Sequence, residues 1–267
     1  MTIKKVKNLN ITLLLGNFHT EMSFLSAIGY VMKNSGLKEV FSLVYAENSI
    51  EKMLGGKHYS RCMRANDLVS TVLKKIIIEQ VDDEHLKESL IETYNTLTES
   101  DLAINFETEF DNISILQGRI SDIKKELSVS ETNALWFKYL EMIDILNCNL
   151  MAERSSDWDL YLSSLKEMLP FFAGSGRNNY TKSVYWFLQE MDDLSADVLE
   201  EFRKGLFVIR RTHSFWSGVS PDLCIEQTLM ASLKGSSGLT HGRSLTEASR
   251  LIWVLSRPGV LAIDTKM

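Results

Sequence analysis

The chain has 267 residues, of which 45% are hydrophobic and 24% are charged, and its net charge is −6. These values are ordinary for a globular protein and allow one large domain or two small ones. Strong non-specific binding of nucleic acid needs clustered Lys and Arg, so the acidic balance disfavours it unless a local basic patch exists. Only three prolines and fourteen glycines favour long helices over a turn-rich sheet fold.

The cysteines and the apolar runs limit the cellular setting that we expect. Cys62, Cys148 and Cys224 are far apart and form no CxxC pair, which predicts neither a disulfide framework nor a zinc ribbon. The apolar run at 11–15 is too short for a secretion signal, and no run approaches the roughly 18 residues of a membrane span. We therefore expect an intracellular protein, in the nucleus or the cytoplasm, that is neither secreted nor embedded in a membrane.

The N-terminal half is predicted to be a strand followed by helices. Residues 11–15 are Leu and β-branched, which predicts a buried strand, and residues 19–33 then have helical spacing. Apolar residues recur every three or four positions up to about residue 204, which predicts successive helices. The acidic stretch 99–111 is the predicted loop or hinge. Asp157 predicts the start of a helix that ends before Pro170, and the next helix is expected to start at 178–179.

The composition changes after Gly205. Residues 207–211 predict a short strand or extended segment, and Ser220-Pro221-Asp222 predicts the start of a helix that reaches about residue 233. A Gly/Ser loop at 235–242 and a last helix at 246–256 are expected to follow. The predicted fold is mainly α, a multi-helix bundle with one or two short strands. Its predicted parts are a strand and helix at 1–34, a helical domain at 35–205, and a C-terminal segment at 206–267 that packs back on the core.

Two pairs of residues in the last quarter could carry chemistry. Asp222 and Glu226 are four residues apart on one predicted helix, so both carboxylates could hold a divalent metal ion. The alternative is an acid at a helix start together with a solvated or ion-paired Glu. Arg210 and Arg211 could contact phosphate, or could form ordinary surface or interdomain ion pairs.

Other candidates have similar alternatives. His19 follows the predicted strand, where catalytic or ligand-binding groups are common, although a structural hydrogen bond is the simpler interpretation. Asp157 is most simply a helix cap. Lys234 and Arg243 flank the Gly/Ser loop, whose backbone amides could bind a phosphate, although a flexible surface loop explains the same residues.

Four segments in a fixed order resemble a known family. They are LGNFHTEMSFL at 15–25; residues 139–162 with AER at 152–154 and DWDLYL at 157–162, continuing to MLPFF at 168–172; NNYTKS at 178–183 with LQEM at 188–191; and the tail at 207–243, especially DLCIEQ at 222–227 and GLTHGR at 238–243. Together they resemble the C-terminal part of the Plavaka-type, or KDZ, transposon-encoded proteins of eukaryotes.

The resemblance implies a DDE-type core with the RNase H-like fold. In such a core three carboxylates hold two Mg²⁺ ions for DNA strand transfer. Glu226 matches the third, helix-borne acid and would be the metal ligand, with Asp222 as the alternative. His19 matches a His that follows a Cys or Asp by three positions in many relatives, whereas this chain has Gly16 there.

The combined expectation is a transposon-derived fragment. Its few strands would be left from a truncated α/β core, and it would be catalytically inactive as it stands, because the strand that bears the first acid is not found. We expect no cofactor in this chain, with Mg²⁺ only in an intact ancestor. Weak DNA binding would involve Arg210, Arg211, Lys234 and Arg243, and a protein partner is also conceivable. The alternative is a helical protein-interaction module with no nucleic-acid role.

Overall fold

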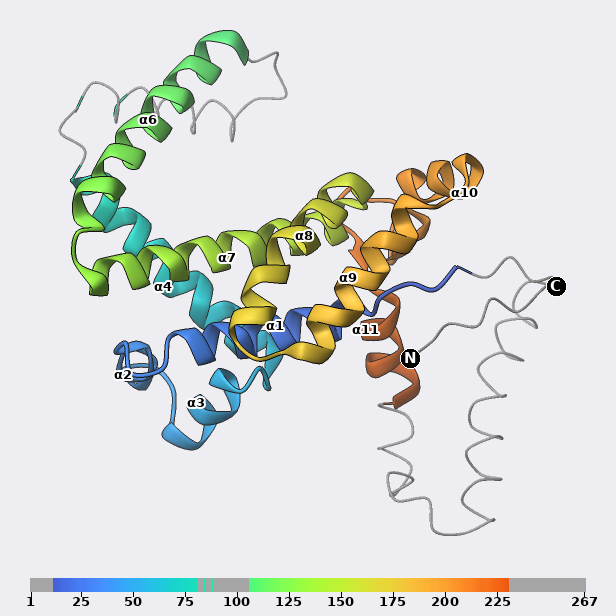
Figure 1. The fold of residues 1–267 in the computed structure, drawn as a ribbon, viewed down its shortest axis with the longest axis horizontal. Helices are drawn as coiled ribbons and strands as arrows, with labels where there is room; N and C mark the ends of the chain where they lie inside the picture. The colour runs from blue at the N-terminus through green and yellow to red at the C-terminus, as the bar shows by residue number, and fades with distance from the viewer. Residues whose placement is uncertain (1–11, 81–83, 85–87, 89–105, 231–267) are drawn as a thin grey trace. The chain divides into compact units, whose positions relative to one another are not determined.

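The computed structural model describes residues 12–80, 84, 88 and 106–230, which are coloured in Figure 1. Within these residues it contains ten α-helices, two π-helical turns and one antiparallel sheet of two short strands. The prediction of a mainly helical bundle with one or two short strands is therefore confirmed. No helix in this part of the chain is both long and apolar enough to cross a membrane.

The chain divides into two compact units that interleave along the sequence. Unit 1 comprises Met1–Phe24 and Leu146–Met267, and unit 2 comprises Leu25–Ile145. Helices α1 (Asn17–Val31) and α7 (Glu131–Ser155) contribute residues to both units. Unit 1 thus joins a segment near the start of the chain to nearly the whole of its second half.

Unit 2 contains α2 (Leu37–Ser42), α3 (Glu47–Leu54), α4 (Tyr59–Glu79) and α6 (Phe106–Leu127), with the adjoining parts of α1 and α7. Its core includes side chains with almost no exposed surface: Leu25, Ile28, Leu37, Ile50, Met53, Met142 and Ile143. A buried polar contact lies among them, because the Tyr139 hydroxyl donates to Asn66 Oδ1 at 2.9 Å. Asn66 Nδ2 in turn donates to the Cys62 carbonyl at 2.8 Å, so these polar groups are satisfied within the core.

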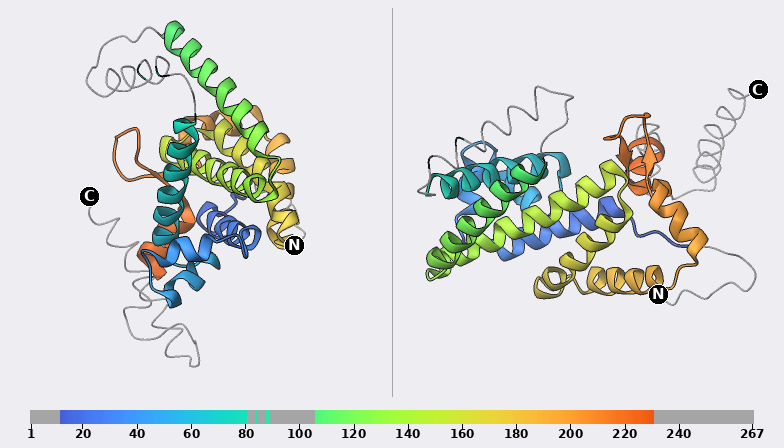
Figure 2. Two further views of the ribbon diagram at one scale, coloured as in Figure 1. Left: turned by 90° about the vertical axis from the view of Figure 1, so that its left-hand side faces the viewer. Right: turned by 90° about the horizontal axis from the view of Figure 1, so that it is seen from above.

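The helices of unit 1 after α7 are α8 (Trp158–Gly174), α9 (Asn178–Asp192), α10 (Ala196–Glu201) and the π-helical turn η1 (Phe202–Leu206). Strands β1 (Ile209–Arg210) and β2 (Gly218–Val219), helix α11 (Pro221–Ile225) and the π-helical turn η2 (Glu226–Met230) follow. Helices α8 and α9 pack against each other, as the views in Figures 1 and 2 show.

An aromatic cluster forms the core of unit 1. Trp158 is 1% exposed, and its ring lies 4.5 Å from that of Phe202 and 5.0 Å from that of Phe207, measured between centroids. Tyr161 stacks on Phe207 at 5.2 Å, and Phe187 lies against both Trp158 and Tyr161. The cluster therefore ties the start of α8 to α9, to η1 and to the segment that leads into β1.

Several local predictions are confirmed. Helix α1 covers most of the predicted helix at 19–33, α9 starts at Asn178, and α11 has Pro221 at its first position. Strand β1 lies within the predicted extended segment at 207–211. The predicted loop at 235–242 and helix at 246–256 lie outside the described residues.

Three local predictions are wrong. Residues 12–15 form no strand, and Leu13 and Leu14 are 49% and 39% exposed; apolar composition is insufficient without a partner strand for the backbone groups. The predicted loop at 99–111 overlaps α6, which already includes residues 106–111. Helix α8 continues through Pro170 to Gly174, and the burial of Met168 and Phe172 on either side offsets the missing backbone hydrogen bond.

Candidate functional site

The first turn of α1 is capped by the side chain of Asp222, which lies about 200 residues later in the sequence. Asp222 Oδ1 accepts a hydrogen bond from the Phe18 backbone N–H at 3.2 Å, and Oδ2 accepts from the His19 N–H at 3.1 Å. The His19 ring adds a contact of 2.9 Å from Nδ1 to Oδ2. Because a carboxylate only accepts, Nδ1 is the protonated nitrogen in this contact. Asp222 thus satisfies N–H groups that the helix itself leaves unpaired.

Gly16 explains how the Asp222 carboxylate comes so close. A Cβ atom at position 16 would lie 2.7 Å from Asp222 Oδ2 and 3.1 Å from Cγ, which is closer than real Cβ contacts. The absence of a side chain at Gly16 therefore leaves room for the carboxylate. In space, Asp222 takes the position beside His19 that a side chain at residue 16 would occupy.

Two opposing effects act on the pKa of Asp222. Burial raises the pKa, whereas the hydrogen bonds from the His19 ring and from the His19 and Phe18 backbone lower it, and the net pKa lies below the ordinary value. The group is therefore an anion at neutral pH. A negative charge at a helix N-terminus is also favoured by the helix dipole.

A buried pair of carboxylates lies beside this cap. Glu21 and Glu153 are 1% and 2% exposed, and the Asn17 side chain lies between them. Asn17 Nδ2 donates to Glu153 Oε2 at 2.8 Å and to Glu21 Oε1 at 3.3 Å. Burial raises the pKa of Glu153, although Asn17 and the backbone N–H of Ser220 partly offset that rise. Burial therefore favours the protonated form of Glu153 more than it would at the protein surface.

A small cavity adjoins these residues. It measures about 10 Å³ and is lined by Asn17, Glu153, Tyr161 and Ser220 among others. Asn17 Oδ1 and Ser220 Oγ are buried and complete no hydrogen bond of good geometry, yet the Ser220 hydroxyl is near enough to lower the pKa of Glu153 and Asp222. Leu14, Leu15, Phe207, Val208 and Pro221 complete its lining, so the cavity is mainly apolar apart from these few polar groups.

The sequence-predicted acids and His19 do come together, but not as a magnesium centre. Glu226 Oε1 lies 4.0 Å from His19 Nε2, and Asp222 contacts the other nitrogen of the same ring. Both oxygens of Asp222 are turned toward N–H donors, and the buried Glu21 and Glu153 share the Asn17 amide. Among the described residues no group of three His, Cys, Asp or Glu side chains is arranged to hold a metal ion. The residues present do not fit a Mg²⁺ site.

The predicted cations lie on the hairpin β1–β2, where Ile209 pairs with Val219 and Arg210 with Gly218. Arg210 Nε donates to Ser156 Oγ at 3.0 Å, and a terminal nitrogen of Arg211 donates to Gln227 Oε1 at 2.9 Å. Neither guanidinium forms a salt bridge with an acidic side chain of the described residues. The ion-pair interpretation of these two arginines is therefore not what this part of the structure shows.

The remaining predicted residues have separate positions. Asp157 is the N-cap of α8, since its Oδ1 accepts from the Leu160 N–H at 3.0 Å. Lys234 and Arg243 lie outside the described residues. Sequence reasoning did not single out Asn17, Glu21 or Glu153 as a cluster. All three lie in segments that carry the family resemblance, but spacing alone does not distinguish polar residues that the fold buries from a solvated helix face.

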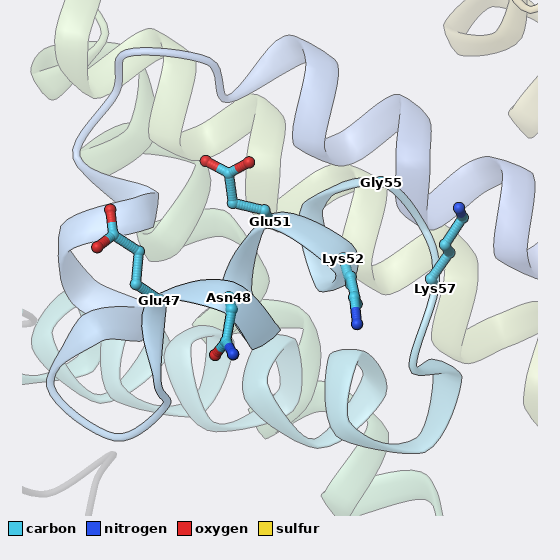
Figure 3. Close-up of a pocket in the computed structure, with 6 residues that line it drawn as sticks. All are labelled: Glu47, Asn48, Glu51, Lys52, Gly55 and Lys57. Carbon is cyan, nitrogen blue, oxygen red and sulfur yellow. The ribbon is translucent and has the colours of Figure 1, made fainter.

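A larger depression lies elsewhere, on unit 2 (Figure 3). It is open, measures about 720 Å³, and is lined by Glu47, Asn48, Glu51, Lys52, Gly55 and Lys57 from α3 and the turn after it. Lys38 pairs with both Glu47 and Glu51 at 3.4 and 3.2 Å. None of the sequence-predicted site residues lines it. Its mixed charges are typical of a solvated surface.

The geometry thus defines a mainly helical protein with a capped polar cluster and a cationic hairpin in unit 1. The chain belongs to the family defined by a domain of unknown function, DUF8702, whose profile matches residues 2–267. No curated protein and no solved structure matches the chain.

Proposed function

We propose that this protein is a transposon-derived fragment related to DDE transposases, and that it contacts DNA without catalysing strand transfer. The observation that carries the DNA contact is the hairpin β1–β2, whose Arg210 and Arg211 are exposed and, within the described residues, hydrogen-bond only uncharged side chains. Cations without an acidic partner can neutralise phosphates at little cost.

The local charge supports this proposal. Residues 202–221 contain four Lys or Arg residues and no Asp or Glu, in a chain whose net charge is −6. Within that stretch, Arg203 pairs with Asp159 at 3.1 Å, and Lys204 lies 3.0 Å from both Glu200 and Glu201. Arg210 and Arg211 therefore differ from Arg203 and Lys204, because neither of them pairs with an acid in the part of the chain that the structure describes.

The position of Asp222 supports the proposal that this protein does not catalyse strand transfer. A metal-ligating carboxylate needs lone pairs directed at the ion, whereas Asp222 directs both oxygens at the first turn of α1. Glu226, the acid that the resemblance assigns to metal binding, lies near the far nitrogen of His19. In this arrangement the acids serve the structure of unit 1.

DNA binding is tested by fluorescence anisotropy with a labelled duplex at several salt concentrations. The wild type is expected to bind at low salt, with an affinity that falls as salt rises. Replacing Arg210 and Arg211 by Ala should reduce the salt slope by about 2, or about 0.9 for each phosphate contact. Arg203→Ala is the matched control, because Arg203 is already paired with Asp159. No binding by the wild type at low salt would refute the proposal.

Inactivity is tested separately with supercoiled plasmid in Mg²⁺ or Mn²⁺. We expect no nicking above the background of Glu226→Gln. Metal-dependent nicking by the wild type that this substitution abolishes would show that the acids do catalyse strand chemistry, and would overturn that half of the proposal.

A second candidate function is a protein-interaction module without a nucleic-acid role. Leu68, Val72 and Ile76 follow one another at four-residue intervals on α4 and are 52%, 56% and 48% exposed. Residues at this spacing share one helix face. Sedimentation velocity of the wild type and Val72→Glu tests self-association through this row. Concentration-dependent association that the substitution removes would favour this function, whereas a monomer at all concentrations would count against it.

A further inference from the structure

The loop between β1 and β2 presents two aromatic rings to solvent. Phe215 is 71% exposed and Trp216 is 55% exposed, and their ring centroids lie 6.4 Å apart with an angle of 39° between the planes. All residues from 210 to 216 are exposed, and the loop is drawn in orange in Figure 2. Neighbouring large rings that pack on no core offer their faces to a planar ligand.

The loop that carries these rings has its own hydrogen bonds. The Ser217 hydroxyl donates to the Thr212 carbonyl at 2.9 Å and lies 2.7 Å from the Ser214 carbonyl. The Ser214 N–H donates to the Thr212 hydroxyl at 3.2 Å, and the Arg211 N–H donates to the Ser217 carbonyl. These contacts fix the loop before any ligand binds, which lowers the entropy lost on binding.

The base of the hairpin is fixed to the end of α7. A Cβ atom at Gly218 would lie 2.0 Å from the Glu153 carbonyl oxygen, so β2 passes directly against that backbone. An Arg154 guanidinium nitrogen donates to the Gly218 carbonyl at 3.1 Å, and Arg210 holds Ser156 from the other strand. The hairpin that carries Phe215 and Trp216 is therefore anchored to unit 1, and Arg210 and Arg211 lie at its base. We call the loop with these two rings the stacking platform.

We propose that Phe215 and Trp216 stack on unpaired bases, so that the hairpin binds single-stranded nucleic acid or single-stranded regions of DNA. This inference rests on the nucleic-acid role proposed above and names the form of the ligand. Bases in a duplex already stack on one another and expose only their edges, whereas unpaired bases offer a π-face to any aromatic side chain. Arg210 and Arg211 supply the charge that the phosphates of the same strand require.

The surrounding charge favours this ligand over an apolar protein surface. The sequence has no acidic residue between Phe202 and Pro221, and the hairpin combines two exposed rings with two cations that pair with no acid of the described residues. Basic grooves with interspersed aromatic residues are the usual composition of single-strand binding sites. A hydrophobic partner would need the rings but not the arginines.

The test compares the full chain and a Phe215→Ala/Trp216→Ala variant, with a labelled oligonucleotide as a single strand and as a duplex of the same sequence. Anisotropy titrations at one low salt concentration measure both affinities. We expect the variant to bind the single strand at least about 5-fold more weakly, since each stacked base that is lost weakens binding between about 5-fold and 150-fold. Duplex binding should change by less than about twofold, because Arg210 and Arg211 are unaltered.

The matched control is Tyr185→Ala/Trp186→Ala on α9. These rings are also adjacent and exposed, 51% and 65%, with centroids 6.0 Å apart, but they lie on a helix away from the hairpin in sequence. This variant should leave single-strand binding unchanged. A second readout uses Trp216→Phe, which keeps an aromatic ring. This variant should retain most of the affinity for the single strand. The quenching of tryptophan fluorescence that the single strand causes in the wild type should be lost.

The outcomes separate the two proposals. A selective loss of single-strand binding in the hairpin variant, with the α9 variant unchanged, supports the stacking platform. If the hairpin variant loses as much affinity for the duplex as for the single strand, the stacking proposal is refuted. The same holds if the hairpin and α9 variants lose equal affinity. In both cases the general DNA contact proposed above is not refuted. Single-strand binding that depends on Arg210 and Arg211 but not on the rings also overturns the stacking proposal. No binding of either form by the wild type refutes both proposals.

Discussion

The capping of α1 by Asp222 leads to a quantitative prediction. Asp222→Ala removes three contacts at once: those with the Phe18 N–H, the His19 N–H and the His19 ring. The loss of a single capping side chain usually costs about 0.5–2 kcal/mol, and a hydrogen bond to a charged group contributes about 1.5–3 kcal/mol. The Asp222 side chain is 19% exposed, so water can replace part of what is lost. We expect a loss of about 2–3 kcal/mol in the free energy of unfolding.

The assay is urea unfolding at neutral pH, followed by far-UV circular dichroism. The matched control is Asp157→Ala, because Asp157 caps the helix that follows it, α8, by a hydrogen bond of 3.0 Å from the Leu160 N–H. That change should cost about 0.5–2 kcal/mol. The reasoning is refuted if Asp222→Ala costs no more than Asp157→Ala.

The pH dependence gives an independent check. The pKa of Asp222 in the folded protein lies below 3.8, its value without neighbours, so the folded state favours the anion. Its stabilising contribution is therefore complete above about pH 5 and is lost as pH falls through the lowered pKa. The difference in stability between the wild type and Asp222→Asn should shrink below pH 4, and a difference that stays constant down to pH 2.5 would contradict this assignment.

Three further substitutions test other parts of the structure. Glu153→Gln should raise the melting temperature at pH 8 but not at pH 4, because the pKa of Glu153 is raised by burial and its ionised form therefore destabilises the folded state. Measured by calorimetry, each kcal/mol gained should add about 2–4 °C. A lower melting temperature at pH 8 would instead show that the charge of Glu153 is needed. Trp158→Ala should cost about 3–5 kcal/mol in urea unfolding, since Trp158 is 1% exposed in the aromatic cluster; a loss below 1 kcal/mol would show that the cluster does not hold unit 1. Tyr139→Phe should lower the free energy of unfolding by about 1–3 kcal/mol, because it leaves Asn66 Oδ1 unpaired in the core of unit 2. An unchanged unfolding midpoint would mean that another donor replaces the hydroxyl.

Helix positions were largely predictable because their signals are local. The apolar spacing and the capping residues predicted α1, α8, α9 and the start of α11. The errors occurred where a local signal competed with packing. Pro170 should end a helix by its own chemistry, yet buried neighbours keep α8 continuous. Residues at 12–15 have strand composition but find no partner strand.

The candidate site was only partly predictable. Arg210, Arg211, His19, Asp222 and Glu226 were identified from their types and positions, and the proximity of His19 to both acids emerged only in the fold. The Asn17, Glu21 and Glu153 cluster had no spacing signal, because its members come from α1 and α7, 136 residues apart at the Asn17–Glu153 contact.

The sequence by itself determined the helical class, the starts of α8, α9 and α11, and the acid-free basic stretch at 202–221, since composition and short-range spacing control these features. Only the tertiary structure decided what the candidate site residues contact. Asp222, which spacing allowed as a metal ligand, instead caps α1 through the gap left by Gly16. Arg210 and Arg211, for which the sequence allowed either a phosphate contact or an ion pair, hydrogen-bond Ser156 and Gln227 and pair with no acid among the described residues. These roles depend on residues about 200 positions apart for Asp222, and only the folded chain brings such residues within hydrogen-bonding distance.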